Sequence, residues 1–187
     1  MEEKYILEKE YTIKFEDFRD GYTAYQKKFV YTKSYIFMAL FIVIAIIYII
    51  AAVKDPSNTM AYVLIFISLA LGFREWYNPR KIRRMYIDTF REIGELKNKI
   101  GIGENFADIS TIPDENVEKI TDEEENELPD ELSNSEPIRI SSSDSTKILE
   151  YDKFILLCVG KESFHIIPKQ EWTADELKTL RSVFSEV

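Results

Sequence analysis

Two apolar runs separated by a short polar turn dominate the pattern of the chain. Residues 35–53 carry no charge, and a second run, 60–73, follows the turn-rich segment Lys54-Asp55-Pro56-Ser57-Asn58. A helix rises about 1.5 Å per residue, so the first run covers roughly the 30 Å hydrocarbon core of a bilayer. The second helix is extended to Trp76 and Tyr77, whose rings suit the membrane interface. The pattern predicts a transmembrane hairpin over 34–77, with spans at 35–53 and 59–77.

The residues before the hairpin, 1–33, change period once. Polar and apolar side chains alternate over 10–16, which predicts a half-buried strand. An aromatic stripe then recurs at helical spacing and predicts an amphipathic helix. Its members are Phe18, Tyr22, Tyr25 and Phe29. Two placements of this stripe remain open: the headgroup layer of a membrane, or packing against the soluble part of the protein.

After the second span, Asn78-Pro79 predicts the start of a new helix, because proline is tolerated at a first helical position. One apolar stripe continues at helical spacing until Gly101 and Gly103 supply a stop. Its members are Ile82, Met85, Tyr86, Ile93, Leu96 and Ile100. The sequence thus predicts a cytoplasmic amphipathic helix over 78–102.

The remaining residues, 103–187, predict a small β-domain closed by a helix. Strands are expected at 106–112, 117–121, 147–151, 153–159 and 163–167. Thr173 and Glu176 form a Ser/Thr-x-x-Glu capping box at the start of a final helix, which buries Leu177, Leu180 and Phe184. The fold class expected is therefore an α+β membrane protein.

Charge is distributed unevenly along the chain. The net charge is −9, and the acidic residues concentrate in 114–136, where Lys119 is the one base. This segment is interpreted as a solvated loop, with an acidic interaction tail as the alternative. No basic and aromatic platform for nucleic acid is present in the sequence. A nucleic-acid partner is therefore not expected.

Basic residues flank the two spans. Lys27, Lys28 and Lys33 precede the first span and a larger cluster follows the second, whereas the connecting loop holds Lys54. The positive-inside rule then predicts a multi-pass cell-membrane protein with both termini cytoplasmic. The same bases are candidate contacts for anionic lipid headgroups, although the orientation rule alone also accounts for them. These candidates are Lys27, Lys28, Arg80, Lys81, Arg83 and Arg84.

Residue types that carry chemistry are sparse. The chain has one histidine, His165, and one cysteine, Cys158, each on an apolar predicted strand. A metal or nucleophile site needs several donors held together, so we predict no catalytic residue, no metal site and no cofactor. The segment 101–106 begins like a dinucleotide-binding loop but has Phe106 in place of the third glycine, and it follows a predicted helix.

Small residues in the spans permit close helix packing, either within the hairpin or between two copies of the chain. They are Ala45, Ala51, Ala52, Ser68, Ala70 and Gly72. Within the apolar cores of the spans, no ionisable residue marks an ion or proton path.

The segments 147–157 and 163–169 resemble the C-terminal domain of the YcxB-like family, most closely at Ile166-Ile167-Pro168-Lys169. The N-terminal pattern, with Phe15-Glu16-Asp17-Phe18 leading into a tyrosine-rich helix and two spans, is similar to the same family. The resemblance implies a bacterial membrane protein whose soluble part is a pleckstrin-homology-like (PH-like) barrel. It implies no catalytic residue.

These observations predict a non-enzymatic membrane protein that presents a cytoplasmic PH-like domain for binding of a protein partner or for assembly. The alternative is a membrane-surface sensor that binds anionic lipid or a small molecule through the basic flanks. The strand at 10–16 is on the same side as the C-terminal sheet in this topology. We expect it to join that sheet.

Overall fold

A computed structural model describes residues 5–112, 137–142, 146–160 and 163–184. The chain forms two compact units, one of Met1–Gly21 with Ile87–Val187 (the β unit) and one of Tyr22–Tyr86 (the helical unit). The fold class is α+β, as expected. In order, the elements are β1 (Leu7–Lys14), α1 (Phe15–Tyr25), the π-helical turn η1 (Gln26–Val30), α2 (Tyr31–Lys54), α3 (Thr59–Ile93), β2 (Glu95–Ile102), β3 (Phe106–Thr111), β4 (Ile138–Ser141), β5 (Thr146–Glu150), β6 (Phe154–Val159), β7 (Ser163–Pro168), the 3₁₀ turn η2 (Lys169–Glu171) and α6 (Ala174–Phe184).

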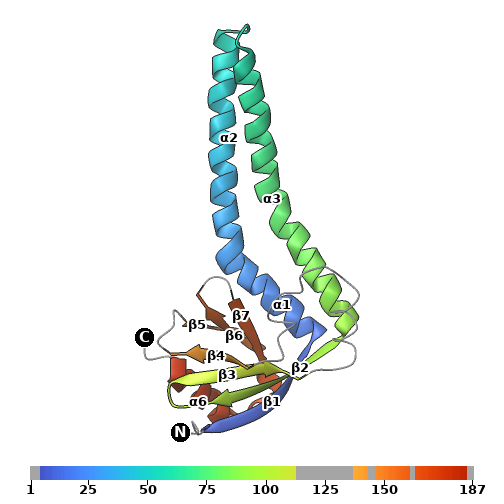
Figure 1. Cartoon of the computed structure of the whole chain (residues 1–187), viewed down its shortest axis with the longest axis vertical. Coiled ribbons are helices and arrows are strands. Elements are labelled where there is room, and N and C mark those ends of the chain that lie inside the picture. Colours follow the sequence, from blue (N-terminus) through green and yellow to red (C-terminus); the bar gives the residue numbers. More distant parts are fainter. Residues whose placement is uncertain (1–4, 113–136, 143–145, 161–162, 185–187) are drawn as a thin grey trace. The chain divides into compact units, whose positions relative to one another are not determined.

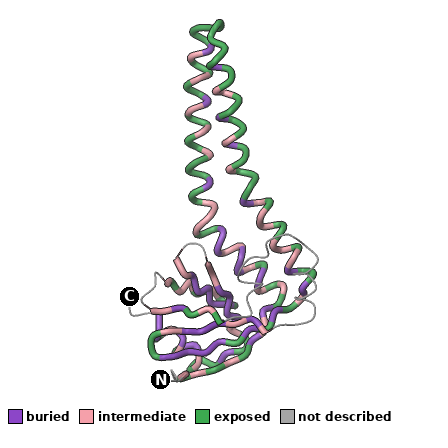
Figure 2. Tube along the Cα trace, viewed as in Figure 1, coloured by how far each residue is buried: buried purple, intermediate pink, exposed green. Residues whose placement is uncertain are grey.

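The helical unit contains α2 and most of α3, which run side by side and are joined by a short turn (Figure 1). The predicted spans 35–53 and 59–77 lie within these two helices. Both helices are long and apolar enough to cross a membrane. Only 11% and 17% of their most apolar windows are buried, and Figure 2 shows exposed residues along both. Most of the apolar surface in these windows is therefore not covered by other described parts of the chain.

The β unit contains two antiparallel sheets. The first has the order β1-β2-β3-β4 and the second β5-β6-β7. Strand β1 confirms the strand expected near 10–16, and β3, β5, β6 and β7 confirm four of the five strands expected in 103–187. The fifth, 117–121, lies outside the described residues together with the acidic segment 114–136.

The predicted helix over 78–102 was wrong at both ends. Helix α3 is continuous from Thr59 to Ile93 with Pro79 inside it, and residues 95–102 form strand β2. Gly94 separates the two elements with a φ of 82°, a conformation that favours glycine. From Leu96 onward the buried positions alternate with exposed Lys97 and Lys99. Leu96 and Ile100 fit this period of two as well as the helical spacing that the sequence suggested.

The expected pairing of the N-terminal strand is confirmed in part. Strand β1 belongs to the β unit and contacts β7, but its ladder partner is β2, with eight paired positions from Leu7↔Ile102 to Lys14↔Glu95. Its buried face holds Tyr11 and Ile13, as the alternation predicted. Strand β1 is thus an integral part of a sheet that also contains β3 and β4.

Helical residues at the edge of the β unit complete its core. Phe18 of α1 stacks on Phe90 of α3, with ring centroids 4.1 Å apart and planes at 5°. Gly21 of α1 lies against β7, since a Cβ there would stand 2.6 Å from Cδ1 of Ile166. In the helical unit, Tyr22 and Tyr25 are buried too, while Phe29 is half-buried. Burial of Phe18, Tyr22 and Tyr25 favours packing inside the protein over the headgroup layer for this aromatic stripe.

We expect Gly94→Ala to lower the free energy of unfolding of the β unit by about 1–2 kcal/mol, because L-residues adopt the left-handed region at that cost. A Cβ at this position would meet nothing within 4 Å, so strain and not crowding is tested. The measurement is urea unfolding of the full chain in detergent, followed by Trp172 fluorescence in a Trp76→Phe background. Gly94→Asn is the matched control and should lose clearly less stability, because asparagine tolerates this conformation. Equal losses in the two variants would contradict the explanation.

Candidate functional site

Small side chains allow α2 and α3 to approach each other. Ala45 and Ala52 of α2 and Ala61 and Ser68 of α3 are buried. Gly72 is buried too, and a Cβ there would lie 3.5 Å from Cβ of Phe41 on α2. Ala70, which the sequence grouped with them, is exposed. These contacts lie within one chain, so they support packing of the hairpin as the use of the small residues.

Pro79 interrupts the backbone ladder of α3, and a side chain from α2 repairs it. A proline has no N–H, so the carbonyl oxygen of Glu75, four residues earlier, loses its helical donor. The hydroxyl of Ser34 donates a hydrogen bond to that oxygen. Gln26, buried in the π-helical turn, donates from Nε2 to the carbonyl oxygen of Pro79 at 3.1 Å. Ser34 and Gln26 therefore join the two helices at the level of the proline.

Arg80 is held among aromatic side chains one turn beyond Trp76. Its Nη2 donates to the hydroxyl of Tyr35 at 3.1 Å, and its Nη1 donates to the carbonyl oxygen of Trp76. The guanidinium also lies over the ring of Trp76, 4.4 Å from its centroid, and 6.0 Å from the ring centroid of Tyr31. Stacking of this kind suits the planar guanidinium of arginine more than the ammonium of lysine. Arg80 is thus fixed by both helices of the hairpin.

The six candidate headgroup residues differ in how they are held. Arg80 and Arg83 are half-buried and the other four are exposed, namely Lys27, Lys28, Lys81 and Arg84. Within the described ranges, no hydrogen bond, ion pair or ring contact is found for any of them except Arg80. Among the described residues, contacts therefore fix the guanidinium of Arg80. The other five candidates carry positive charge without such contacts.

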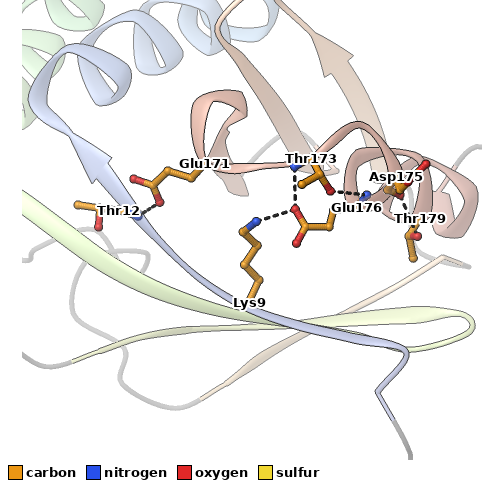
Figure 3. A network of polar contacts seen from close by, with 7 residues as sticks. All are labelled: Lys9, Thr12, Glu171, Thr173, Asp175, Glu176 and Thr179. Atoms are coloured by element: carbon orange, nitrogen blue, oxygen red, sulfur yellow. Dashed lines mark hydrogen bonds and ion pairs between the residues drawn. The ribbon is translucent and has the colours of Figure 1, made fainter.

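In the β unit, a polar network connects β1 to the start of α6 (Figure 3). Lys9 Nζ lies 2.6 Å from Glu176 Oε2, which also accepts a 2.7 Å hydrogen bond from the backbone N–H of Thr173. The N–H of Glu176 donates in return to Thr173 Oγ1, which confirms the predicted capping box. The hydrogen bond from Lys9 lowers the pKa of Glu176. One carboxylate thus caps a helix and ties that helix to the first strand.

A second polar cluster covers part of the four-stranded sheet. Arg139 of β4 donates two hydrogen bonds to Asp108 of β3, at 2.9 and 2.8 Å, and Tyr5 donates a third at 2.8 Å. The bonds from Arg139 hold the pKa of Asp108 below its usual range, and the bond to Asp108 raises the pKa of Tyr5. Both acceptor oxygens of this carboxylate are occupied. The cluster joins Tyr5, β3 and β4 and leaves Asp108 unsuited to act as a base.

The residues with the most reactive side chains lie in an apolar environment. Burial lowers the pKa of His165 to about 4 and raises the pKa of Cys158 to about 11. A neutral thiol is a poor nucleophile, and a histidine needs a neighbouring group to act on. Within the described part of the chain, no group of three or more His, Cys, Asp or Glu residues has the arrangement of a metal site.

Sequence reasoning identified the basic flank but not its organisation. The roles of Ser34 and Gln26 and the aromatic partners of Arg80 depend on contacts between helices that are more than 40 residues apart. A usable signal was present, since Pro79 within a long helical pattern leaves a carbonyl that needs a donor.

No model of a known protein family, no curated protein and no solved structure matches the chain.

We expect Ser34→Ala to destabilise the hairpin by about 1–2 kcal/mol, because the carbonyl of Glu75 then lacks a partner. The measurement is thermal unfolding of the helices by circular dichroism in detergent. In a Pro79→Ala background the helix regains its N–H donor, so the same Ser34→Ala change should cost much less. Thr32→Ala, on the exposed face of α2, is the control and should have little effect. If the loss from Ser34→Ala is unchanged by Pro79→Ala, the hydroxyl does not replace the missing N–H.

Proposed function

We propose that the chain is an integral membrane protein whose helical unit crosses the bilayer as a two-span hairpin and carries the β unit at one membrane face. This proposal is supported by the large apolar side chains that are exposed on α2 and α3. Ile36, Val53 and Phe66 are 64%, 76% and 75% exposed. Exposure of so much apolar surface on two long helices is unfavourable in water and favourable in the hydrocarbon core of a bilayer.

The connectivity supports an even number of spans. The chain enters the hairpin from β1 and returns to β2, and these two strands are neighbours in one sheet. Both ends of the hairpin must therefore lie on the same side of the membrane. Residues 22–34 and 74–86 contain eight basic residues and one acidic residue, Glu75, whereas the loop holds Lys54. This bias supports a cytoplasmic location of the β unit and of both termini.

The β unit serves, in this proposal, as a binding domain for a protein partner or for assembly. Two antiparallel sheets and a C-terminal helix agree with a PH-like domain, and the YcxB-like resemblance points to the same class. Among the described residues, strand β4 ends the order of the four-stranded sheet, and an edge strand can accept a strand from a partner. The buried environments of His165 and Cys158 favour binding over catalysis.

The alternative function is a sensor of anionic lipid or of a small molecule. Its support is the basic flank, in which Lys27, Lys28, Lys81 and Arg84 are exposed. Each base near an anionic surface contributes about 1 kcal/mol. This contribution is nonspecific, so exposure alone favours retention at the membrane over recognition of one ligand.

The topology can be tested with single cysteines, because the chain contains one native cysteine and it is buried. In a Cys158→Ala background, Ser57→Cys marks the connecting turn and Asp175→Cys marks the exposed start of α6. A membrane-impermeant maleimide applied to intact cells should label the Ser57→Cys variant. It should label the Asp175→Cys variant only after lysis. The reverse pattern would contradict the orientation, and labelling of both in intact cells would contradict a spanning hairpin.

The binding role can be tested by copurification from gently solubilised membranes. The intact chain is compared with a chain truncated after Gly103, which keeps the hairpin but lacks β3 to α6. We expect at least one protein to follow the intact chain and to be lost on truncation, while both chains remain in the membrane fraction. Identical sets of copurifying proteins would contradict partner binding by the β unit.

A further inference from the structure

We propose that Arg80 is a pre-organised phosphate ligand that binds the phosphate group of an anionic phospholipid at the cytoplasmic membrane surface. This inference rests on the proposed two-span topology. It goes further because it assigns lipid binding to one of the eight basic residues of the flank. It also names the group that this residue recognises, namely the phosphate oxygens.

The guanidinium is already positioned by the protein. Hydrogen bonds to Tyr35 and to the carbonyl oxygen of Trp76 use two of its five N–H donors, and the ring of Trp76 covers one face. Among the described residues these are its contacts together with the ring of Tyr31. Three donors therefore remain for an anion. A planar fork with donors in fixed directions matches two phosphate oxygens and loses little side-chain entropy on binding.

The depth of the group favours a lipid phosphate. Side chains on a helix point back toward its N-terminus, so Arg80 reaches the level of Trp76 and Tyr35. Tyr35 and Trp76 lie roughly 26–29 Å along the helix axes from Lys54 and Thr59 at the connecting turn, about one hydrocarbon thickness. Aromatic rings of this type occur at the headgroup level. The charge of Arg80 is therefore held where lipid phosphates are found.

Among the described residues, no carboxylate forms an ion pair with Arg80. The carboxylate of Glu75, on the same helix, has its Oε2 3.4 Å from the hydroxyl of Ser34. A cation at the edge of the hydrocarbon region is favourable only with a partner or with access to the headgroups. A phosphate from the membrane meets that need.

Arg74 provides a matched comparison at similar depth. It lies on α3 one half-turn before Trp76 and is exposed, and no contact holds its guanidinium within the described residues. Arg74→Lys and Arg80→Lys preserve the charge equally, yet only the second replaces a fixed fork by a mobile ammonium. A binding site made of charge alone would not distinguish the two variants.

The test uses the full chain in detergent micelles with a Trp172→Phe change, so that Trp76 is the one tryptophan and reports on its own environment. Three probes are titrated: short-chain phosphatidylglycerol, inorganic phosphate, and short-chain diacylglycerol, which lacks phosphate. We expect phosphatidylglycerol to change Trp76 fluorescence saturably and diacylglycerol not to do so. Arg80→Lys should weaken phosphatidylglycerol binding by about tenfold, which corresponds to 1.4 kcal/mol. Arg74→Lys should change it less than twofold. Tyr35→Phe, which removes one hydrogen bond to the guanidinium, should give an intermediate loss.

Each other outcome has a defined meaning. Equal weakening by Arg80→Lys and Arg74→Lys, or no weakening by either, would overturn the proposal. Saturation by inorganic phosphate at the affinity of phosphatidylglycerol would overturn the lipid source of the ligand. A response to diacylglycerol equal to that of phosphatidylglycerol would overturn phosphate recognition. If instead the cysteine labelling contradicts a spanning hairpin, the proposed function fails independently of these titrations.

Discussion

The pairing of β1 with β2 is the interaction on which the rest of the molecule depends. These strands are separated in sequence by both long helices, yet they share eight paired positions in one antiparallel ladder. Closing such a long loop is entropically unfavourable, so burial of apolar side chains from both strands has to support the ladder. Tyr11, Ile13, Leu96 and Ile100 supply that burial on the inner face. With this ladder formed, the chain that leaves the β unit has to return to it.

The same face of β1 connects the sheet to the C-terminal helix. Lys9 pairs with Glu176, its ammonium lies 5.2 Å from the ring centroid of Trp172, and Tyr11 meets the edge of that ring. Glu171 accepts a hydrogen bond from the backbone N–H of Thr12. Strand β1 therefore joins α6 as well as β2, which makes these elements part of one folded unit.

Local patterns predicted the elements well where one period dominates. The capping box at Thr173 and Glu176, the hydrophobic strand β6 and the two apolar helices follow from residue type and spacing, and the structure contains them. The prediction was wrong at 95–102, where Leu96, Asn98, Ile100 and Ile102 fit a strand while Leu96 and Ile100 also fit a helix. Gly94, with a φ of 82°, separates α3 from this strand, and a glycine's positive φ is not readable from composition. Strand β4 was missed because four residues carry too little periodicity.

The candidate site was harder to predict because its geometry arises between helices. The sequence identifies basic residues and a proline, but not that Ser34 reaches the carbonyl of Glu75 or that Arg80 lies against Trp76 and Tyr35. Pro79 accounts for the first of these contacts, because it removes the donor of the Glu75 carbonyl and a polar side chain in an otherwise apolar interface satisfies that carbonyl instead.

The two units also differ in net charge. Residues 22–86 contain nine basic and two acidic residues, so the net charge of −9 originates in the rest of the chain. An anionic membrane surface would attract the flanks of the hairpin and repel an acidic domain. In the proposed two-span topology, this charge distribution favours a β unit whose surfaces stay accessible, as the proposed binding of a protein partner requires.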